Sequence, residues 1–125
     1  MSEALIGVVV CHRDLASALV GAAEEISGVR DALVPVSNSG CDRGDLEERV
    51  REAIGGRPAV VFVDMPSGSC LVATLQRLRG HPETAAVTGV NLAMLLDFLF
   101  HRDLPPAEAA GRAVNVGTRA IRVPA

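Results

Sequence analysis

A histidine and an aspartate each follow directly on a run of apolar residues. Residues 8–10 lead through Cys11 to His12, and residues 59–63 end on Asp64. Valine-rich runs of this kind are typical of strands buried on both faces, as in a parallel sheet covered by helices. Ligands bind at the carboxyl ends of the strands in such sheets. We therefore expect His12 and Asp64 to meet at a site that handles an anion, with phosphate as the favoured ligand.

The chemistry that these two residues offer together is phosphoryl transfer. A neutral imidazole accepts a phosphoryl group near pH 7 because one ring nitrogen keeps a free lone pair. A carboxylate bonded to the other nitrogen fixes the tautomer and stabilises the imidazolium character that develops during attack. We expect Asp64 to orient His12 in this way. Taken singly, His12 is also explained as a hydrogen-bonded loop residue and Asp64 as a turn former, but their convergence favours function.

A loop of small residues follows Asp64 and completes the predicted phosphate site. Ser67, Gly68 and Ser69 precede a predicted helix, where backbone N–H groups and the helix dipole favour phosphate oxygens. Gly68 permits a close approach of the backbone, and the Ser69 hydroxyl can add a hydrogen bond. The structural alternative for Ser69 is that it only caps the helix.

Strands and helices alternate along residues 1–125, which we interpret as one α/β domain. Successive βα units predict a parallel sheet with helices on both faces and the strand order 2-1-3-4. The order then reverses between the first and third strands, where His12 and Asp64 lie. The strands are expected at about 4–10, 32–36, 59–63 and 85–90, with a short final strand at 119–123.

The predicted helices lie between these strands. The first, at about 15–26, is expected to follow an Asp14 cap and to turn Leu15, Leu19, Ala22 and Ile26 inward. Asp45 and Glu48 resemble a capping box at the start of the second helix. The third is expected to begin near Ser69 and to bury Leu71, Val72, Leu75 and Leu78, the fourth to end near His101, and the fifth to begin at Pro105-Pro106.

Composition excludes several classes of protein. Hydrophobic residues make up 49% of the chain, which excludes disorder, and the net charge of -3 without single-sign runs argues against a nucleic-acid partner. No apolar segment approaches the roughly 20 residues that span a bilayer, so we expect no direct membrane insertion. The N-terminus lacks a basic region and a cleavage site, and three cysteines fit a reducing compartment; both indicate a cytoplasmic protein.

Three segments of the chain carry a resemblance to a known family. Residues 11–13 read Cys-His-Arg, residues 64–69 read Asp-Met-Pro-Ser-Gly-Ser, and residues 89–96 read Gly-Val-Asn-Leu-Ala-Met-Leu-Leu. The order and spacing of these segments resemble the enzyme IIA domains of the mannose/fructose/sorbose family of the bacterial phosphoenolpyruvate sugar phosphotransferase system. That family has Thr-His-Gly after the first strand, Asp-x-x-Gly-Gly-Ser after another, and Gly-Val-Asn before a Met-Leu-rich helix.

The resemblance implies a phosphotransferase that works without a cofactor. His12 would accept a phosphoryl group from the phosphohistidine of the carrier HPr and pass it to a IIB domain during sugar uptake. Asp64 would hold the imidazole, while Gly68 and Ser69 line the phosphate pocket. The resemblance also implies a homodimer in which the final strand, 119–123, pairs with the sheet of the partner subunit.

The chain departs from the family pattern at three positions around the predicted site. Arg13 replaces a small residue, and it either contacts phosphate or alters partner docking. Met65 removes one hydroxyl donor, and Ser67 replaces the first glycine of the loop. The histidine, the aspartate, the second glycine and the serine are retained, so we expect phosphorylation competence to persist.

Two other functions are compatible with the residues. Cys11, Cys41 and Cys70 all follow predicted strands, and with His12 they could form a zinc or thiol-redox site. Their spacing matches no compact metal motif, so no metal is expected. The second alternative is a regulatory domain of the same fold, whose phosphorylated state signals to another protein. His81 is interpreted as a surface-loop residue and His101 as favourable charge at a helix C-terminus.

Overall fold

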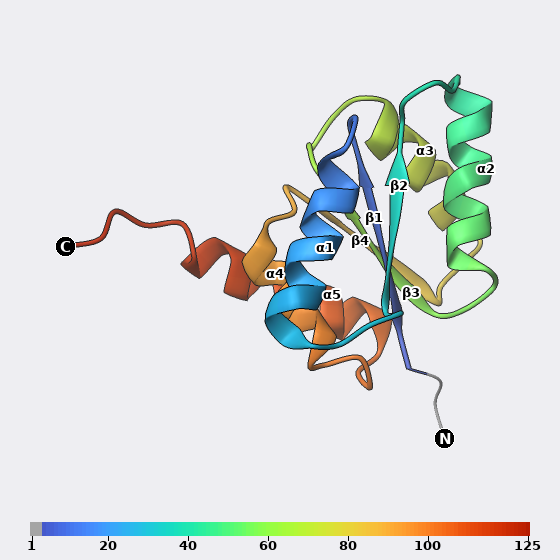
Figure 1. The fold of residues 1–125 in the computed structure, drawn as a ribbon. Coiled ribbons are helices and arrows are strands. Elements are labelled where there is room, and N and C mark those ends of the chain that lie inside the picture. Colours follow the sequence, from blue (N-terminus) through green and yellow to red (C-terminus); the bar gives the residue numbers. More distant parts are fainter. Residues whose placement is uncertain (1–3) are drawn as a thin grey trace.

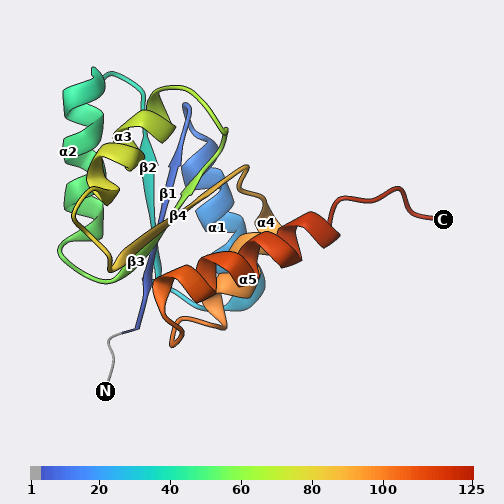
Figure 2. The ribbon, with the colours of Figure 1, turned by 180° about the vertical axis from the view of Figure 1, so that it is seen from behind.

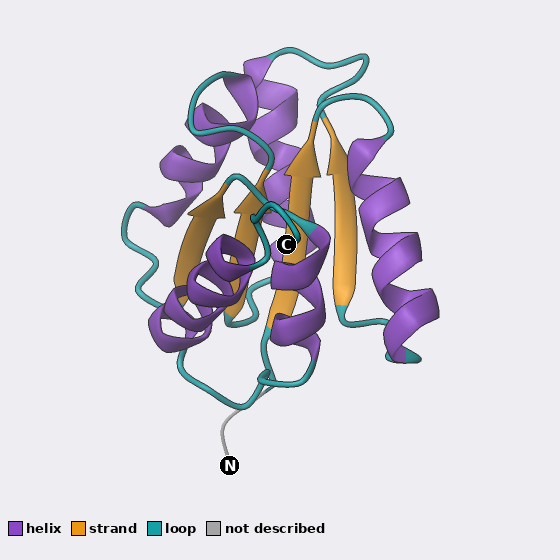
Figure 3. Cartoon of the chain, turned by 90° about the vertical axis from the view of Figure 1, so that its left-hand side faces the viewer, coloured by secondary structure: helices purple, strands orange, loops and turns teal. Residues whose placement is uncertain are grey.

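Four parallel strands form the central sheet, and helices cover both of its faces (Figures 1 and 3). The computed structural model describes residues 4–125. The order β2-β1-β3-β4 confirms the predicted topology. The strands are β1 (Ile6–Cys11), β2 (Leu33–Ser37), β3 (Ala59–Val63) and β4 (Thr84–Thr88), and the helices are α1 (Leu15–Ser27), α2 (Arg43–Ile54), α3 (Ser69–Leu78), α4 (Leu92–Leu99) and α5 (Pro106–Arg119).

Each face of the sheet has its own hydrophobic core. Successive side chains of a strand point to opposite faces, so Val9 and Phe62 pack under α1, α4 and α5 while Val8 and Val61 pack under α2 and α3. Figure 2 shows α5 crossing the first of these faces. Phe62 meets Phe98 of α4 edge to face, with ring centroids 5.3 Å apart. Burial on both sides explains why β1 and β3 are continuously apolar.

The buried faces of α1 and α3 differ from the prediction. In α1 the buried residues are small or β-branched, whereas Leu15 and Ile26 are 45% and 62% exposed. In α3 Leu75 is exposed as well. Small residues allow a helix to approach the sheet closely, and both helices carry two adjacent apolar stripes. The residues that are buried instead are Ala16, Val20 and Ala23 in α1, and Cys70, Ala73 and Thr74 in α3.

The beginnings of the helices also differ in detail from the prediction. The N-cap of α2 is Asp42, whose side chain accepts a hydrogen bond from the Asp45 N–H at 2.8 Å, so the capping box predicted to begin at Asp45 is wrong. Asp14 does occupy the N-cap position of α1, but its side chain forms no capping bond there. Ser69 is the first residue of α3, and Gly68 is its N-cap.

The C-terminal segment does not form the predicted strand in this chain. Helix α5 continues to Arg119, and residues 121–125 have no regular secondary structure. They extend away from the sheet (Figures 1 and 2). A strand needs a hydrogen-bonded neighbour, and this tail has no strand partner among residues 4–120. Pairing of the tail with a second copy stays a prediction.

Within residues 4–125, none of the helices combines the length and the apolar character needed to cross a membrane.

Candidate functional site

Strands β1 and β3 bring His12 and Asp64 together at the carboxyl ends of the two central strands. The two strands are neighbours, with Val10 opposite Val63, so the residues just beyond their carboxyl ends meet. The Nδ1 atom of His12 lies 2.8 Å from Oδ2 of Asp64, and the backbone N–H of His12 donates to the same oxygen at 2.9 Å. The His12 side chain is 41% exposed and that of Asp64 only 9%. A buried carboxylate therefore holds a partly exposed imidazole.

The contact with Asp64 defines which ring nitrogen is available for chemistry. An ionised carboxylate only accepts hydrogen bonds, so the short contact places the imidazole proton on Nδ1. The lone pair of the neutral ring then resides on Nε2. The pair is thus arranged for nucleophilic attack by Nε2, with Asp64 behind the ring to balance the positive charge that develops.

The loop of residues 65–69 begins and ends beside His12. Asp64 precedes the loop, and Cys70 follows it with Sγ 4.0 Å from Nδ1 of His12. Gly68 adopts φ 93° and ψ -174°, a conformation that is essentially restricted to glycine. The side chains of Ser67 and Ser69 are exposed on this loop. The amino end of α3 therefore lies at the site, as predicted.

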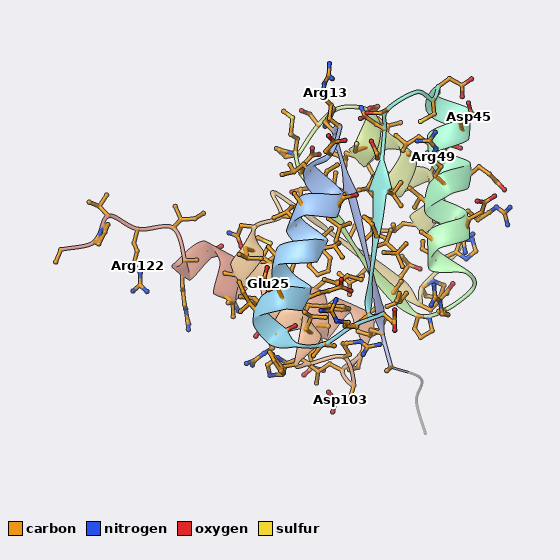
Figure 4. The ribbon with its side chains drawn as sticks, in the orientation of Figure 1. Arg13, Glu25, Asp45, Arg49, Asp103 and Arg122 are labelled. Atoms are coloured by element: carbon orange, nitrogen blue, oxygen red, sulfur yellow. The ribbon has the colours of Figure 1, made fainter. Side chains whose placement is uncertain are left out.

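Arg13 lies next to the imidazole in an unfavourable backbone conformation. Its φ of 51° is in the left-handed region, which favours glycine. The Thr-His-Gly pattern of the resembling family has glycine at this position. The Arg13 N–H donates to Oδ1 of Asn38 at 3.2 Å, and its side chain points away from the body of the protein (Figure 4). A non-glycine side chain at such a position suggests a role outside folding.

The loop after β2 forms a second wall of the site, which the sequence patterns did not predict. Residues 38–40, after β2, line an open hollow of about 540 Å³ together with His12 and Arg13. Arg49 of α2 positions this loop by donating from Nη1 to the carbonyl oxygens of Ser37 and Ser39 at 2.8 and 3.0 Å. The signal was present in the sequence, because a polar run directly follows the strand that neighbours β1.

The three cysteines do not form one cluster. Cys11 packs under α1, α4 and α5, whereas Cys41 and Cys70 pack on the opposite face. Burial, together with the nearby charge of Asp64, raises the pKa of Cys11 to about 12 and that of Cys70 to about 11. Both thiols therefore stay protonated at neutral pH. Because the thiolate is the reactive form, this argues against a thiol-redox site.

The Gly-Val-Asn segment has a structural role. Oδ1 of Asn91 accepts a hydrogen bond from the Met94 N–H at 3.0 Å and so caps α4, while Nδ2 donates to the Gly117 carbonyl of α5 at 3.1 Å. Asn91 thereby joins two helices on one face of the sheet. It thus fixes how α4 packs against α5.

The other two histidines lie toward the amino ends of the strands, opposite the end that carries His12. His81 precedes β4 and bridges Arg77 and Glu83, with both contacts at 3.1 Å. His101 follows α4, and its Nδ1 lies 2.8 Å from the carbonyl oxygen of Asp97. Both are therefore positioned away from His12, which follows the carboxyl end of β1.

Comparison with solved structures shows a fold shared with phosphotransferase-system IIA proteins. The phosphotransferase system component EIIA from Streptococcus agalactiae superimposes with a TM-score of 0.87 at 14% identity, covering 95% of this chain and 96% of that chain. The mannose/sorbose specific IIA subunit from Enterococcus faecalis gives 0.82 at 20% identity, with coverages of 98% and 96%. A sigma-54 interaction domain protein from Enterococcus faecalis gives 0.73 at 14% identity, with coverages of 96% and 94%.

Sequence comparison defines the family. A search of curated protein sequences found no match. The model of the EIIA-man family, described as the PTS system fructose IIA component, matches residues 7–114, which include His12 and Asp64. The chain therefore belongs to the EIIA-man family of phosphotransferase-system IIA components, in agreement with the resemblance of its three sequence segments.

Proposed function

We propose that this IIA component is a histidine phosphocarrier. Nε2 of His12 accepts a phosphoryl group from the phosphohistidine of an HPr-like carrier and passes it to a histidine of a IIB domain or protein during sugar uptake. The observation that carries the proposal is the 2.8 Å contact between Nδ1 of His12 and Asp64, which leaves the lone pair on Nε2. This role places the chain in the cytoplasm with its donor.

Transfer exchanges one phosphorus–nitrogen bond for another. Nε2 of His12 attacks the phosphorus, the bond to the donor histidine breaks, and the electron pair returns to the donor ring. Asp64 stabilises the positive charge on the His12 ring, while the Gly68 and Ser69 amides at the start of α3 hold phosphoryl oxygens. Ser67 and Ser69 add hydroxyl groups, and Arg13 contributes a cation. No cofactor is required.

The test is phosphorylation of the intact chain. Incubation with phosphoenolpyruvate, enzyme I and HPr should add about 80 Da, and acid should remove it because a phosphoramidate is acid-labile. Nitrogen-15 NMR should show the phosphoryl group on Nε2 of the labelled histidine. An acid-stable product, or a phosphoryl group on Nδ1, would contradict the proposed mechanism.

Two substitutions of Arg13 separate the effect of its backbone conformation on stability from its proposed role in binding phosphate. We expect Arg13→Gly to slow phosphoryl transfer about tenfold, because a charge-assisted hydrogen bond to phosphate is lost. The free energy of unfolding should not fall, because glycine suits the positive φ. Arg13→Ala keeps the backbone conformation unfavourable and should show the same slower transfer. Unchanged transfer rates in both variants would assign Arg13 no part in phosphate binding.

We also propose that the chain forms a homodimer through its C-terminal tail. The side chains of Ile121 and Val123 are 76% and 94% exposed on a segment that extends into solvent. The two outer strands, β2 and β4, each leave one edge of the sheet unpaired. Pairing of the tail with the sheet of a second subunit would bury both apolar side chains and cover an edge. The two His12 sites would stay on separate subunits.

Removing the tail tests this assembly. Because α5 extends to Arg119, the deletion should begin after Ala120 and remove residues 121–125. Sedimentation should then show a monomer, and chemical denaturation should show a lower free energy of unfolding. Arg122→Ala, a change in the same tail, should leave the dimer intact. Wild-type protein that sediments as a monomer at micromolar concentration would refute the dimer without affecting the phosphoryl chemistry.

A regulatory role is the second candidate. The Enterococcus faecalis neighbour with this fold is described as a sigma-54 interaction domain protein and not as a sugar-specific IIA component, which supports this alternative. The two roles differ in the fate of the phosphoryl group. Rapid loss of the added mass on mixing with IIB proteins from the same genome supports the carrier. A phosphorylated chain that retains its phosphoryl group with every such IIB protein supports the regulator.

A further inference from the structure

Three side chains of different chemistry converge behind the phosphoacceptor ring. One imidazole nitrogen of His12, one carboxylate oxygen of Asp64 and the sulfur of Cys70 all lie within 4.8 Å of one another. Cys70 reaches this position from the first turn of α3, with its sulfur 4.0 Å from Nδ1 of His12. Among the residues that the structure describes, no other group of three such ligands meets this distance.

A second observation at the same place points to a ligand. Asp64 is nine-tenths buried, and its Oδ2 atom already accepts two hydrogen bonds from His12. Its Oδ1 atom is fully buried and has no hydrogen-bond partner among the described residues. A buried carboxylate oxygen without a partner is costly, and a bound cation would remove that cost.

We propose that His12, Asp64 and Cys70 form a binding site for a thiophilic divalent cation such as Zn²⁺, and that the bound ion prevents phosphorylation of His12. The occupancy of this site would regulate the phosphocarrier. Metal binding itself is independent of the proposed function, and only its inhibitory consequence rests on it.

The donor set suits zinc. Imidazole nitrogen, carboxylate oxygen and thiolate sulfur are its usual protein ligands, and three protein ligands plus one water make a common four-coordinate site. Zinc–ligand bonds of about 2.0–2.3 Å put tetrahedral ligand atoms roughly 3.3–3.8 Å apart. The 4.0 Å separation between the Cys70 sulfur and Nδ1 is close to that range. Small rotations of the side chains, with one carboxylate oxygen of Asp64 as the oxygen ligand, would complete the geometry.

Inhibition follows from the two nitrogens of one ring. The cation takes the lone pair of Nδ1, so the proton that Nδ1 carried must move to Nε2. Nε2 then has no lone pair with which to attack phosphorus. Cys70 loses its proton to solvent when the metal–sulfur bond forms, and no change of oxidation state occurs. The metal and the phosphoryl group therefore bind to mutually exclusive states of His12.

Cobalt reports directly on the sulfur ligand. Wild-type protein, kept reduced with a phosphine, should bind one Co²⁺ per chain with a thiolate-to-cobalt charge-transfer band in the near ultraviolet. Cys70→Ser and Cys70→Ala should both lose that band, and alanine keeps the site small and apolar if serine perturbs folding. Cys41→Ser, which removes another free thiol on the same face, should retain the band. A wild-type protein without the band, or a band that persists in both Cys70 variants, would overturn the proposal.

Zinc then tests the consequence for His12. Equimolar Zn²⁺ should lower the phosphorylation rate of the wild-type protein at least tenfold, and a chelator should restore it. The phosphorylation rate of Cys70→Ala, whatever its value without metal, should be the same with and without zinc, which also excludes an effect of zinc on enzyme I or HPr. Equal inhibition of both proteins would overturn the regulatory role. Failure of His12 phosphorylation without zinc, with the cobalt band present, would instead count against the phosphocarrier function alone.

Discussion

His12→Ala should abolish the acid-labile gain of about 80 Da on incubation with phosphoenolpyruvate, enzyme I and HPr. Alanine has no nitrogen to accept the phosphoryl group, and no other histidine lies beside Asp64. The fold should persist, because the His12 side chain is 41% exposed and lies beyond the end of β1. Intact-mass spectrometry of the reaction mixture measures the result.

The remaining two histidines supply matched controls. His81→Ala and His101→Ala each remove an imidazole that is hydrogen-bonded but lies toward the amino ends of the strands, away from His12. Both variants should gain the full mass. Persistent labelling of His12→Ala would assign the phosphoryl group to another residue and remove the basis of the carrier proposal.

Asp64→Asn should slow phosphoryl transfer by a factor of roughly 10²–10⁴ with the fold intact. Oδ2 of Asp64 receives both the backbone N–H and the Nδ1 contact of His12, and in asparagine this one position holds either the carbonyl oxygen or the amide group. When the amide group occupies it, it donates to Nδ1 and so stabilises the tautomer that carries the proton on Nε2. The nucleophile is then lost, and the charge that would balance the phosphorylated ring is lost with it. Rapid-quench kinetics with phospho-HPr measures the change.

A second buried carboxylate provides the control for this substitution. Oδ1 of Asp97 lies 3.3 Å from Nδ1 of His101, and the Asp97 side chain is also nearly buried. Asp97→Asn makes the same chemical change beside a histidine that has no proposed part in transfer. Its transfer rate should stay within about twofold of wild type. Near-normal transfer by folded Asp64→Asn would show that Asp64 serves only to shape the turn.

The sequence by itself determined the sheet and the meeting of His12 with Asp64. Continuous apolar runs specify strands that are buried on both faces, and the alternation of strands and helices specifies a right-handed parallel sheet. Those two facts favour the order β2-β1-β3-β4, which places His12 and Asp64 at neighbouring strand ends. Their contact follows from topology, so it could be predicted for two residues that are 52 positions apart in the chain.

The tertiary structure alone decided which side chains each helix buries and what else reaches the ring. Periodicity cannot choose between two adjacent apolar stripes, so the exposure of Leu15 and Ile26 depends on how closely α1 approaches the sheet. The position of Cys70 depends on how α3 starts after Gly68, and the place of the Asn38 loop depends on its anchoring by α2. These features arise from packing between segments distant in sequence, which local patterns of residue type do not encode.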